Sequence, residues 1–331
     1  MWYEALRPAL FALDPERAHK LALQALRTVG SRALRVPAGV PIELMGLRFP
    51  NRVGLAAGFD KNAAAVDGLG SLGFGFIEVG TVTPRAQLGQ PRPRLFRLPA
   101  EGALINRLGF PNDGAAKVAL RLRHRQYRGI LGVNIGKNAT TPTARAIDDY
   151  VSCMRMVQQV ADYVTVNVSS PNTADLRKLQ EREHLEPLLT ALLQERTKHS
   201  RAREHHLPLL VKIAPDLSIA EVQDMASLLR DLGIDGVIAT NTTVSRQGVS
   251  GAASIQAGGI SGRPLYPLAL RTVTNLRAAL GSAFPIIGLG GIDSPRAAVA
   301  MHAAGADLVQ IYTGLIYKGP SLISQCVRAL E

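Results

Sequence analysis

Short runs of aliphatic and β-branched residues recur along most of the chain, and segments with helical spacing of apolar residues separate them. The runs predict eight strands, at 53–57, 76–79, 130–135, 163–168, 209–213, 237–240, 286–289 and 308–311. Helical spacing is clearest at 147–161, 219–232 and 295–304. Eight strands alternating with helices over about 290 residues favour a closed (β/α)8 barrel, a TIM barrel. An open doubly wound sheet is the alternative, because the pattern alone does not prove closure.

The first forty residues have a different pattern and predict a helical hairpin ahead of the barrel domain, which takes residues 41–331. Leu6, Leu10 and Leu13 fall on one face of a first helix. Asp14-Pro15-Glu16 is a start signal for a second helix, which Gly30 ends, and a linker follows at 36–41. Two interpretations stay open: the hairpin packs on the barrel, or it lies on a membrane with its arginines facing anionic lipid.

Composition narrows the choice of protein class. The chain has 331 residues, 47% of them hydrophobic, which is enough for one large core, and only two cysteines, which favours a reduced compartment. The formal net charge is +12, yet Lys and Arg are scattered and form no ladder with aromatic residues. We therefore expect no nucleic-acid partner. No apolar run reaches the roughly 18 residues of a membrane span, and the N-terminus does not predict a signal peptide.

Polar residues follow the predicted strands at their C-terminal ends, where barrels carry their functional groups. The fourth strand continues into Asn167-Val168-Ser169-Ser170-Pro171-Asn172-Thr173. Its amides and hydroxyls can bind a neutral polar ring, and one hydroxyl can exchange a proton with it. Taken alone, the stretch also fits an ordinary Asx/Ser turn. Asn or Lys recurs at several other strand ends, whereas no His or metal-ligand cluster does, so we expect no metal-assisted mechanism.

Glycine-rich turns after the last two strands indicate a phosphate site. Gly290-Gly291 follows the seventh strand, and Thr313-Gly314 follows the eighth. Such turns present backbone N–H groups to a phosphate, which belongs either to a phosphorylated sugar or to flavin mononucleotide (FMN). Lys212 favours FMN, because a cation beside the flavin ring stabilises the charge of its reduced form.

Several short motifs, in their order and spacing, resemble the dihydroorotate dehydrogenases of pyrimidine synthesis over nearly the whole chain. The motifs lie at 57–61, 106–110, 134–138, 167–173, 212–216, 239–243 and 259–264. Within that family, Ser170 and the helical hairpin resemble the quinone-reducing, membrane-associated class, since the soluble classes carry a cysteine at the position of Ser170. The loop Pro84-Arg85-Ala86-Gln87-Leu88-Gly89 departs from the family pattern, which puts the shape of that loop in doubt.

The resemblance implies oxidation of dihydroorotate to orotate, with Ser170 as the catalytic base, FMN as the hydride acceptor and a membrane quinone as the electron acceptor. The implied substrate-binding residues are Lys61, Asn106, Arg107, Leu108, Gly109, Phe110, Asn167, Asn172, Asn241 and Thr242. The implied flavin-binding residues are Ala57, Gly58, Phe59, Asp60, Lys61, Thr81, Asn134, Asn167, Lys212, Thr240, Gly262, Gly291, Tyr312 and Thr313. His19, Arg97 and Tyr312 would flank the quinone. The implied location is peripheral, on the cytoplasmic face of the cell membrane.

Three other functions are weighed against this one. Another FMN-dependent barrel oxidoreductase would share the flavin motifs but would not need the Asn and Ser residues around Ser170. A sugar-phosphate barrel should show a catalytic Glu or His at a strand end, and we find none. A non-catalytic basic protein would leave the strand-end pattern without a purpose.

Overall fold

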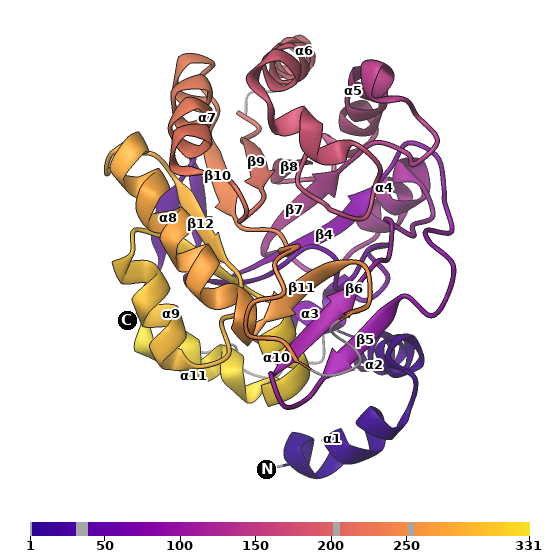
Figure 1. Ribbon diagram of the computed structural model, residues 1–331. Helices are drawn as coiled ribbons and strands as arrows, with labels where there is room; N and C mark the ends of the chain where they lie inside the picture. The colour runs from indigo at the N-terminus through magenta and orange to yellow at the C-terminus, as the bar shows by residue number, and fades with distance from the viewer. Residues whose placement is uncertain (1, 31–38, 201–205, 251–254) are drawn as a thin grey trace.

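The computed structural model describes residues 2–30, 39–200, 206–250 and 255–331, so residues 36–38 of the predicted linker lie outside it (Figure 1). The predicted barrel is confirmed, because eight parallel strands close in the order β10-β12-β13-β3-β4-β7-β8-β9. The strands are β3 (Val53–Leu55), β4 (Phe76–Val82), β7 (Ile130–Ile135), β8 (Tyr163–Asn167), β9 (Leu209–Ile213), β10 (Gly236–Ala239), β12 (Ile286–Leu289) and β13 (Leu308–Ile311). All eight coincide with predicted strands, with small differences at their ends.

Helices surround the barrel, as Figure 1 shows. They are α3 (Val66–Gly70), α4 (Ala115–Arg123), α5 (Ala146–Val157), α6 (Arg182–Ser200), α7 (Ile219–Asp231), α8 (Tyr266–Leu280), α9 (Pro295–Ala303), α10 (Thr313–Lys318) and α11 (Ser321–Ala329). Local sequence sets some of their starts. Ser218 and Glu221 form a capping box at α7, and Ser294 caps α9 ahead of Pro295.

Two small sheets supplement the barrel, and the sequence pattern predicted neither. β1 (Ile42–Leu44) and β2 (Leu47–Phe49) form an antiparallel pair whose Phe49 is buried against Phe76. β5 (Leu95–Leu98), β6 (Ala103–Asn106) and β11 (Gly259–Gly262) form an antiparallel sheet beside the barrel. β5 and β6 are close in sequence, whereas β6 and β11 pair across more than 150 residues, Asn106 with Gly259 for example.

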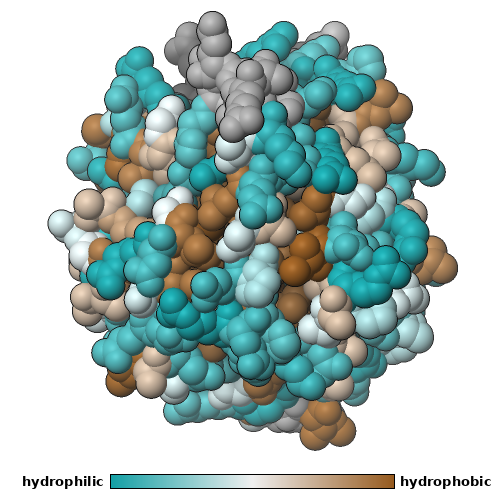
Figure 2. Space-filling view, turned by 90° about the horizontal axis from the view of Figure 1, so that it is seen from above, coloured by the Kyte–Doolittle hydropathy of each residue, from teal (hydrophilic) through white to brown (hydrophobic). Residues whose placement is uncertain are grey.

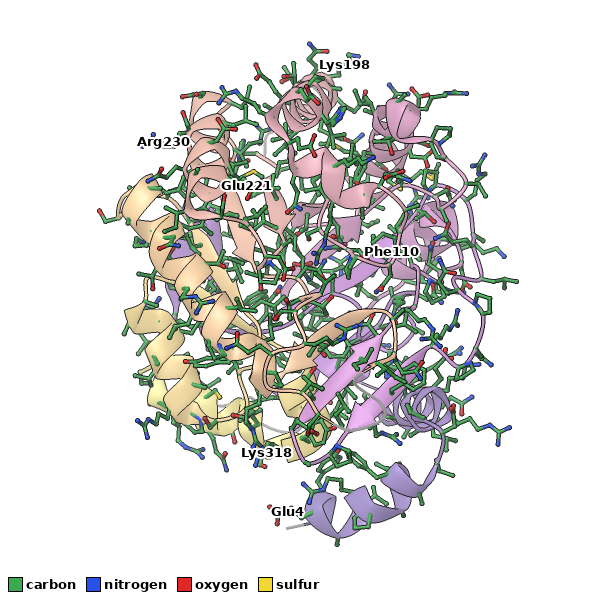
Figure 3. All side chains as sticks on the ribbon, in the orientation of Figure 1. Glu4, Phe110, Lys198, Glu221, Arg230 and Lys318 are labelled. Atoms are coloured by element: carbon green, nitrogen blue, oxygen red, sulfur yellow. The ribbon has the colours of Figure 1, made fainter. Side chains whose placement is uncertain are left out.

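The core has two parts. Aliphatic side chains fill the space between the strands and the outer helices, and both Cys153 and Cys326 are buried there. A second cluster, which includes Phe76, Tyr163 and Leu210, fills part of the barrel interior. Charged side chains such as Lys198 and Arg230 point outward, whereas Phe110 lies inside the molecule (Figure 3). Seen from above, hydrophilic side chains cover most of the surface and hydrophobic ones gather near its centre (Figure 2).

The predicted hairpin is present as α1 (Trp2–Ala12) and α2 (Pro15–Val29), with Asp14 capping α2. Side-chain hydrogen bonds attach it to the barrel domain: Tyr3 Oη donates to the carbonyl of Ile316 (2.6 Å), and Arg7 donates to that of Tyr317 (2.9 Å). Among the described helices, none is long and apolar enough to cross a membrane.

Two arginines of the barrel domain bind the hairpin at the turn between α1 and α2. Arg97 donates to the carbonyls of Leu10, Phe11 and Leu13 at the end of α1. Arg94 forms a forked ion pair with Glu16 at the start of α2. The hairpin is therefore docked on the barrel at both of its helices.

Candidate active site

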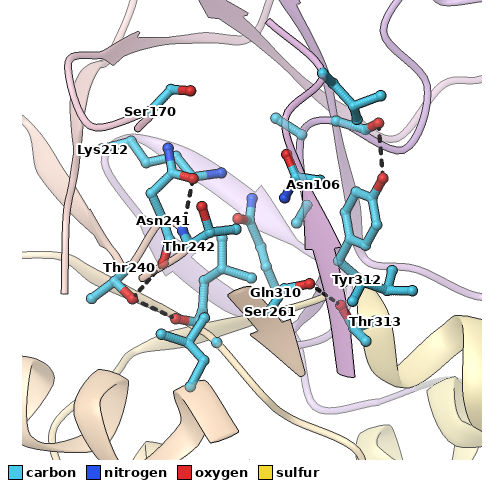
Figure 4. A pocket seen from close by; sticks show the side chains of 18 of the residues that line it. Asn106, Ser170, Lys212, Thr240, Asn241, Thr242, Ser261, Gln310, Tyr312 and Thr313 are labelled. Atoms are coloured by element: carbon cyan, nitrogen blue, oxygen red, sulfur yellow. Dashed lines mark hydrogen bonds between the residues drawn. The ribbon is translucent and has the colours of Figure 1, made fainter. Parts of the chain in front are cut away.

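A cavity of about 970 Å³, including the space open to solvent, lies at the C-terminal ends of the barrel strands. Leu95, Leu104 and Ser261 from the β5-β6-β11 sheet line one of its sides. Of the residues predicted for substrate or flavin, the cavity is lined by Ala57, Gly58, Lys61, Thr81, Asn106, Leu108, Gly109, Phe110, Asn167, Ser170, Asn172, Lys212, Thr240, Asn241, Thr242, Gly262, Gly291, Tyr312 and Thr313. Figure 4 shows side chains of this set converging from several strand ends. The fold thus gathers most of the predicted residues at one place.

Amide side chains at the ends of barrel strands form one wall of the cavity. Asn167, the last residue of β8, donates through Nδ2 to Thr81 Oγ1 (2.9 Å) and to Asn134 Oδ1 (3.2 Å). Asn241, just after β10, donates to Asn167 Oδ1 (3.2 Å) and to Ser169 Oγ (3.0 Å). All of these hydrogen bonds are buried or partly buried, so the amides are held in fixed orientations.

Ser170 lies in the loop that follows β8, and its side chain is almost fully buried. Its Oγ accepts a hydrogen bond from the backbone N–H of Asn172 (3.3 Å). The Asn172 side chain in turn donates to Asn106 Oδ1 (2.9 Å), which connects this loop to β6. Thr173 follows in the same loop, and its buried Oγ1 has no partner among the described residues. The Ser170 hydroxyl, which can exchange a proton with a ligand, therefore faces the same cavity as the amides.

Two lysines bring positive charge to the cavity. Lys61 donates to the carbonyl of Gly58 (2.5 Å), and burial together with the nearby charge of Arg94 lowers its pKa to about 8. Lys212 pairs in register with Asn167 and is buried; burial lowers its pKa, while the charge of Glu78 opposes that shift. No hydrogen bond or ion pair of the Lys212 ammonium is seen within the described part of the chain. Both ammonium groups can serve a negatively charged ligand.

Bare backbone forms the opposite wall, where the phosphate turns were predicted. A Cβ on Gly291 would lie 2.7 Å from the carbonyl oxygen of Gly262, and one on Gly314 would lie 2.1 Å from that of Ile292. Thr313 donates to Ser261 Oγ beside these turns (2.9 Å). On the inner side, the buried Gln310 Oε1 and Thr242 Oγ1 have no partner in the described chain. Turns without side chains, hydroxyls and uncommitted polar atoms form a donor set that fits a phosphate and a heterocyclic ring, as in a flavin.

Six predicted site residues do not line the cavity. Asn134 is buried behind Asn167. Asp60 accepts from the backbone N–H groups of Asn62, Ala64 and Ala65, so it shapes the turn after β3. Arg107 binds Gln256 and stacks over Phe96 at 4.8 Å. The three others are Phe59, His19 and Arg97.

Of those three, Phe59 and His19 connect the cavity to the hairpin, and Arg97 contacts the hairpin alone. The ring of Phe59 packs edge-on against Tyr312 (centroids 5.6 Å apart) and His19 (5.1 Å). Arg97 faces the end of α1, as described above. Burial, together with the charge of Lys61, lowers the pKa of His19 to about 4, so its imidazole is neutral at pH 7.

The sequence analysis did not single out several lining residues. Leu95, Leu104 and Ser261 belong to the sheet that it did not predict. Gln310 lies inside β13 rather than past its end, and a search of strand ends does not find it. An inward-facing amide in an otherwise aliphatic strand was the available signal.

A closed barrel whose strand ends combine a phosphate-type turn, a buried lysine and a cluster of amides defines a class: the flavin-dependent barrel oxidoreductases. The comparisons with known proteins narrow this class. A family model described as dihydroorotate dehydrogenase matches residues 40–331.

Full-length relatives agree with that match. Two proteins named dihydroorotate dehydrogenase (quinone), from Aromatoleum aromaticum and Leptothrix cholodnii, are each 52% identical; both alignments cover 99% of this chain, and they cover 95% and 98% of the relatives. A crystal structure of DHODH from Eimeria tenella in complex with ferulenol superposes with a TM-score of 0.89 at 38% identity, covering 96% of this chain and 90% of that one. The chain belongs to the dihydroorotate dehydrogenase family, so it is an oxidoreductase of pyrimidine biosynthesis that oxidises dihydroorotate to orotate.

Proposed function

We propose that the chain carries out this reaction with FMN in the barrel cavity, with Ser170 as the base and with a membrane quinone as the final electron acceptor. One observation carries the proposal: Ser170, the amide wall, the two lysines and the glycine turns all line a single cavity. A base, a ring-binding surface and a phosphate site can then act on one pair of bound molecules.

The side chains match the groups that they would have to recognise. Dihydroorotate is a cyclic imide with a carboxylate. The amides of Asn106, Asn172 and Asn241 offer donors and acceptors for its ring, and Lys61 offers a cation for its carboxylate. The glycine turns at 262 and 290–291, with Thr313, would hold the phosphate of FMN, and Lys212 would lie near its ring. FMN supplies the hydride acceptor when it is bound.

Ser170 would remove the proton from the substrate carbon next to the one that gives up the hydride. A serine hydroxyl is a weak base, so it needs a site shielded from water and an outlet for its proton. The buried position of Ser170 supplies the first. The unpartnered hydroxyl of Thr173, three residues on, is our candidate for the second.

Titration of the purified protein with FMN and orotate tests this assignment. We expect one FMN per chain and a change in the flavin absorbance spectrum on addition of orotate, because both molecules occupy one cavity. A folded protein that takes up no FMN would refute the cofactor assignment. A flavin spectrum that orotate leaves unchanged would refute the shared site.

We further propose that residues 1–40 form the quinone entrance and that residues 41–331 form the catalytic domain. The rings of His19, Phe59 and Tyr312 form a continuous contact from α2 to the cavity. A neutral His19 places no buried charge beside the apolar ring of a quinone. His19→Ala should slow oxidation of the reduced protein by quinone and leave its reduction by dihydroorotate unchanged. Equal rates of quinone-linked oxidation in the variant and the wild type would refute this role of His19.

The outer face of the hairpin would contact the membrane at its cytoplasmic surface. Leu6, Leu13 and Leu21 are 45%, 39% and 49% exposed, and each could enter the lipid interface. Sedimentation with vesicles checks the contact. We expect binding to anionic vesicles that weakens with salt but is not abolished, because the leucines contribute a salt-independent part. Absence of binding to any vesicle would refute the contact.

A further inference from the structure

The barrel interior holds a carboxylate that the reaction described above does not use. Glu78 lies in the middle of β4 and has no exposed surface. Its Oε1 accepts a hydrogen bond from Asn134 Nδ2 (2.8 Å). Its Oε2 accepts from Tyr163 Oη (3.1 Å) and from Gln310 Nε2 (3.0 Å). Three donors thus converge on one buried carboxylate, which is costly to bury and needs partners of this kind.

The hydrogen bonds beyond Asn134 all run in one direction, toward Glu78. Because Asn134 donates to Glu78, its Oδ1 is left to accept, and it accepts from Thr81 Oγ1 (2.5 Å) and Asn167 Nδ2 (3.2 Å). Because Asn167 donates in that direction, its own Oδ1 accepts from Asn241 Nδ2 (3.2 Å). Asn167 and Asn241 both line the cavity, whereas Glu78 does not.

An asparagine amide can be turned over with little change in shape, which exchanges its donor for its acceptor. A carboxylate has no such freedom, because when ionised it only accepts. The carboxylate at the inner end therefore decides the orientation of the Asn134 amide, and Asn134 Oδ1 in turn holds Nδ2 of Asn167. Backbone N–H groups hold the outer amides in the same sense: that of Ser169 donates to Asn167 Oδ1 (3.3 Å), and that of Thr242 donates to Asn241 Oδ1 (2.8 Å). We propose that Glu78 is a positioning residue that, through Asn134, keeps the Asn167 amide in the orientation that it presents to the dihydroorotate ring and to the flavin.

This inference rests on the proposed function, since it concerns what the Asn167 amide recognises. A substrate ring that meets a donor where it needs an acceptor leaves both groups buried and unsatisfied, which is more damaging than losing one contact. Glu78 also acts on the site electrostatically, through Lys212. Burial lowers the pKa of Lys212, and the charge of Glu78 opposes that shift.

Glu78→Gln tests the role with nearly unchanged volume. The two donors Tyr163 and Gln310 favour the new carbonyl on their side, so the new amide N–H₂ faces Asn134 and turns its amide over. We expect the orotate dissociation constant, read from the flavin spectrum, to rise about 10-fold or more. Tyr163→Phe is the matched control. It removes a donor to the same carboxylate but leaves the contact with Asn134, so the constant should stay within about threefold of the wild type.

A double variant separates orientation from packing. Asn134→Asp alone sets two carboxylates against each other and should weaken binding of both orotate and FMN. In Glu78→Gln with Asn134→Asp, the new glutamine donates to the new aspartate, which again only accepts from Thr81 and Asn167. The negative charge is also restored, now at residue 134 instead of residue 78. We expect the double variant to bind orotate at least about 10-fold more tightly than Asn134→Asp does.

The measurements are the orotate dissociation constant, the FMN dissociation constant from fluorescence quenching on the apoprotein, and the unfolding temperature of each variant. A double variant no better than its single parents overturns the inference, whether or not Glu78→Gln folds. So does a folded Glu78→Gln with the orotate affinity of the wild type, or a loss as large in Tyr163→Phe. Failure of the proposed function is a separate result, because the wild type itself would then not bind orotate.

Discussion

Ser170 is where the proposal can be tested at a single atom. Ser170→Ala should still bind FMN and orotate, because the amide wall and the glycine turns remain. Its flavin reduction by dihydroorotate should slow by about 100-fold or more, as expected when a positioned base is removed. Ser170→Cys should retain part of the rate with an altered pH profile, because a thiol loses its proton, and so becomes available as a base, at a lower pH than a serine hydroxyl does. Rapid-mixing rates for Ser170→Ala within twofold of the wild type would rule out the role.

Lys61 gives orotate binding a predictable pH dependence. Its pKa lies near 8 in the free protein, lowered by burial and by Arg94, so the ammonium is fully charged only below that pH. We expect orotate affinity to be constant below about pH 7 and to fall by up to about 10-fold per pH unit above about pH 8, because the deprotonated form no longer attracts the carboxylate. Lys61→Met should bind orotate weakly at every pH, with no change of slope near pH 8. An affinity independent of pH up to 10 in the wild type would contradict the assignment.

The same residues show what a sequence can and cannot reveal about a site. Asn167, Ser170 and Lys212 stand at or near strand ends in a barrel pattern, and the structure brings them to one cavity. Glu78 has no such signal, because strands of a parallel sheet are buried on both faces and one polar residue could point either way. From the sequence, Arg97 was predicted to contact a ligand. In the structure it donates to carbonyls at the end of α1, and these contacts depend on docking of the hairpin, which the sequence pattern does not reveal.

At the scale of elements, the contact between α2 and α3 depends on a glycine. A Cβ on Gly68 would lie 2.0 Å from the carbonyl oxygen of Leu26. Alanine normally favours a helix over glycine by about 1 kcal/mol, yet here it must push α2 away from the barrel. We expect Gly68→Ala to impair the quinone-linked step more than the reduction by dihydroorotate. Stopped-flow measurement of both half-reactions checks this.

Gly70→Ala provides the comparison for that variant. Its Cβ would meet the ring of Tyr127 at 2.3 Å, a clash within the barrel domain rather than with the hairpin. If Gly68→Ala and Gly70→Ala change the two half-reactions in the same proportion, the effect is a general loss of packing and not a displaced hairpin.

The elements that were predicted are determined by residues close in sequence, whereas the sheet that was missed depends on pairing between residues far apart in sequence. The strand at 209–213 and the start of the helix at 219 follow from local runs and a capping box, and both were found. β5, β6 and β11 are each four residues long, and β6 pairs with β11 across more than 150 positions, while β5 is added to β6 at the edge of the same sheet. A short strand defined by a distant partner has too little local pattern to be recognised.

For the whole molecule, the division of labour between hairpin and barrel makes a prediction. A protein that starts at Pro41 should fold, bind FMN and be reduced by dihydroorotate, because the cavity lining belongs to the later residues. It should fail to pass electrons to a long-tailed quinone in vesicles. A short water-soluble quinone, which needs no membrane contact, isolates the loss of His19: with it, the truncated protein should be oxidised about as slowly as His19→Ala.

The alternative for the hairpin is a purely structural one. Tyr3, Arg7 and Glu16 attach it to the barrel domain, so its loss exposes surface that it now covers. Equal losses in the two half-reactions of the truncated protein, with a lower unfolding temperature, would favour that reading over quinone access.

The burial of both cysteines makes the protein suitable for site-specific labelling. Burial raises the pKa of the Cys326 thiol to about 12 and also raises that of Cys153, so neither should react with a maleimide while the protein is folded. A cysteine introduced on the outer face of the hairpin, at Leu21 for example, would then be the one reactive thiol of the folded chain. A spin label attached there could report its depth in a bilayer through oxygen and nickel accessibility, with the two native thiols left in place.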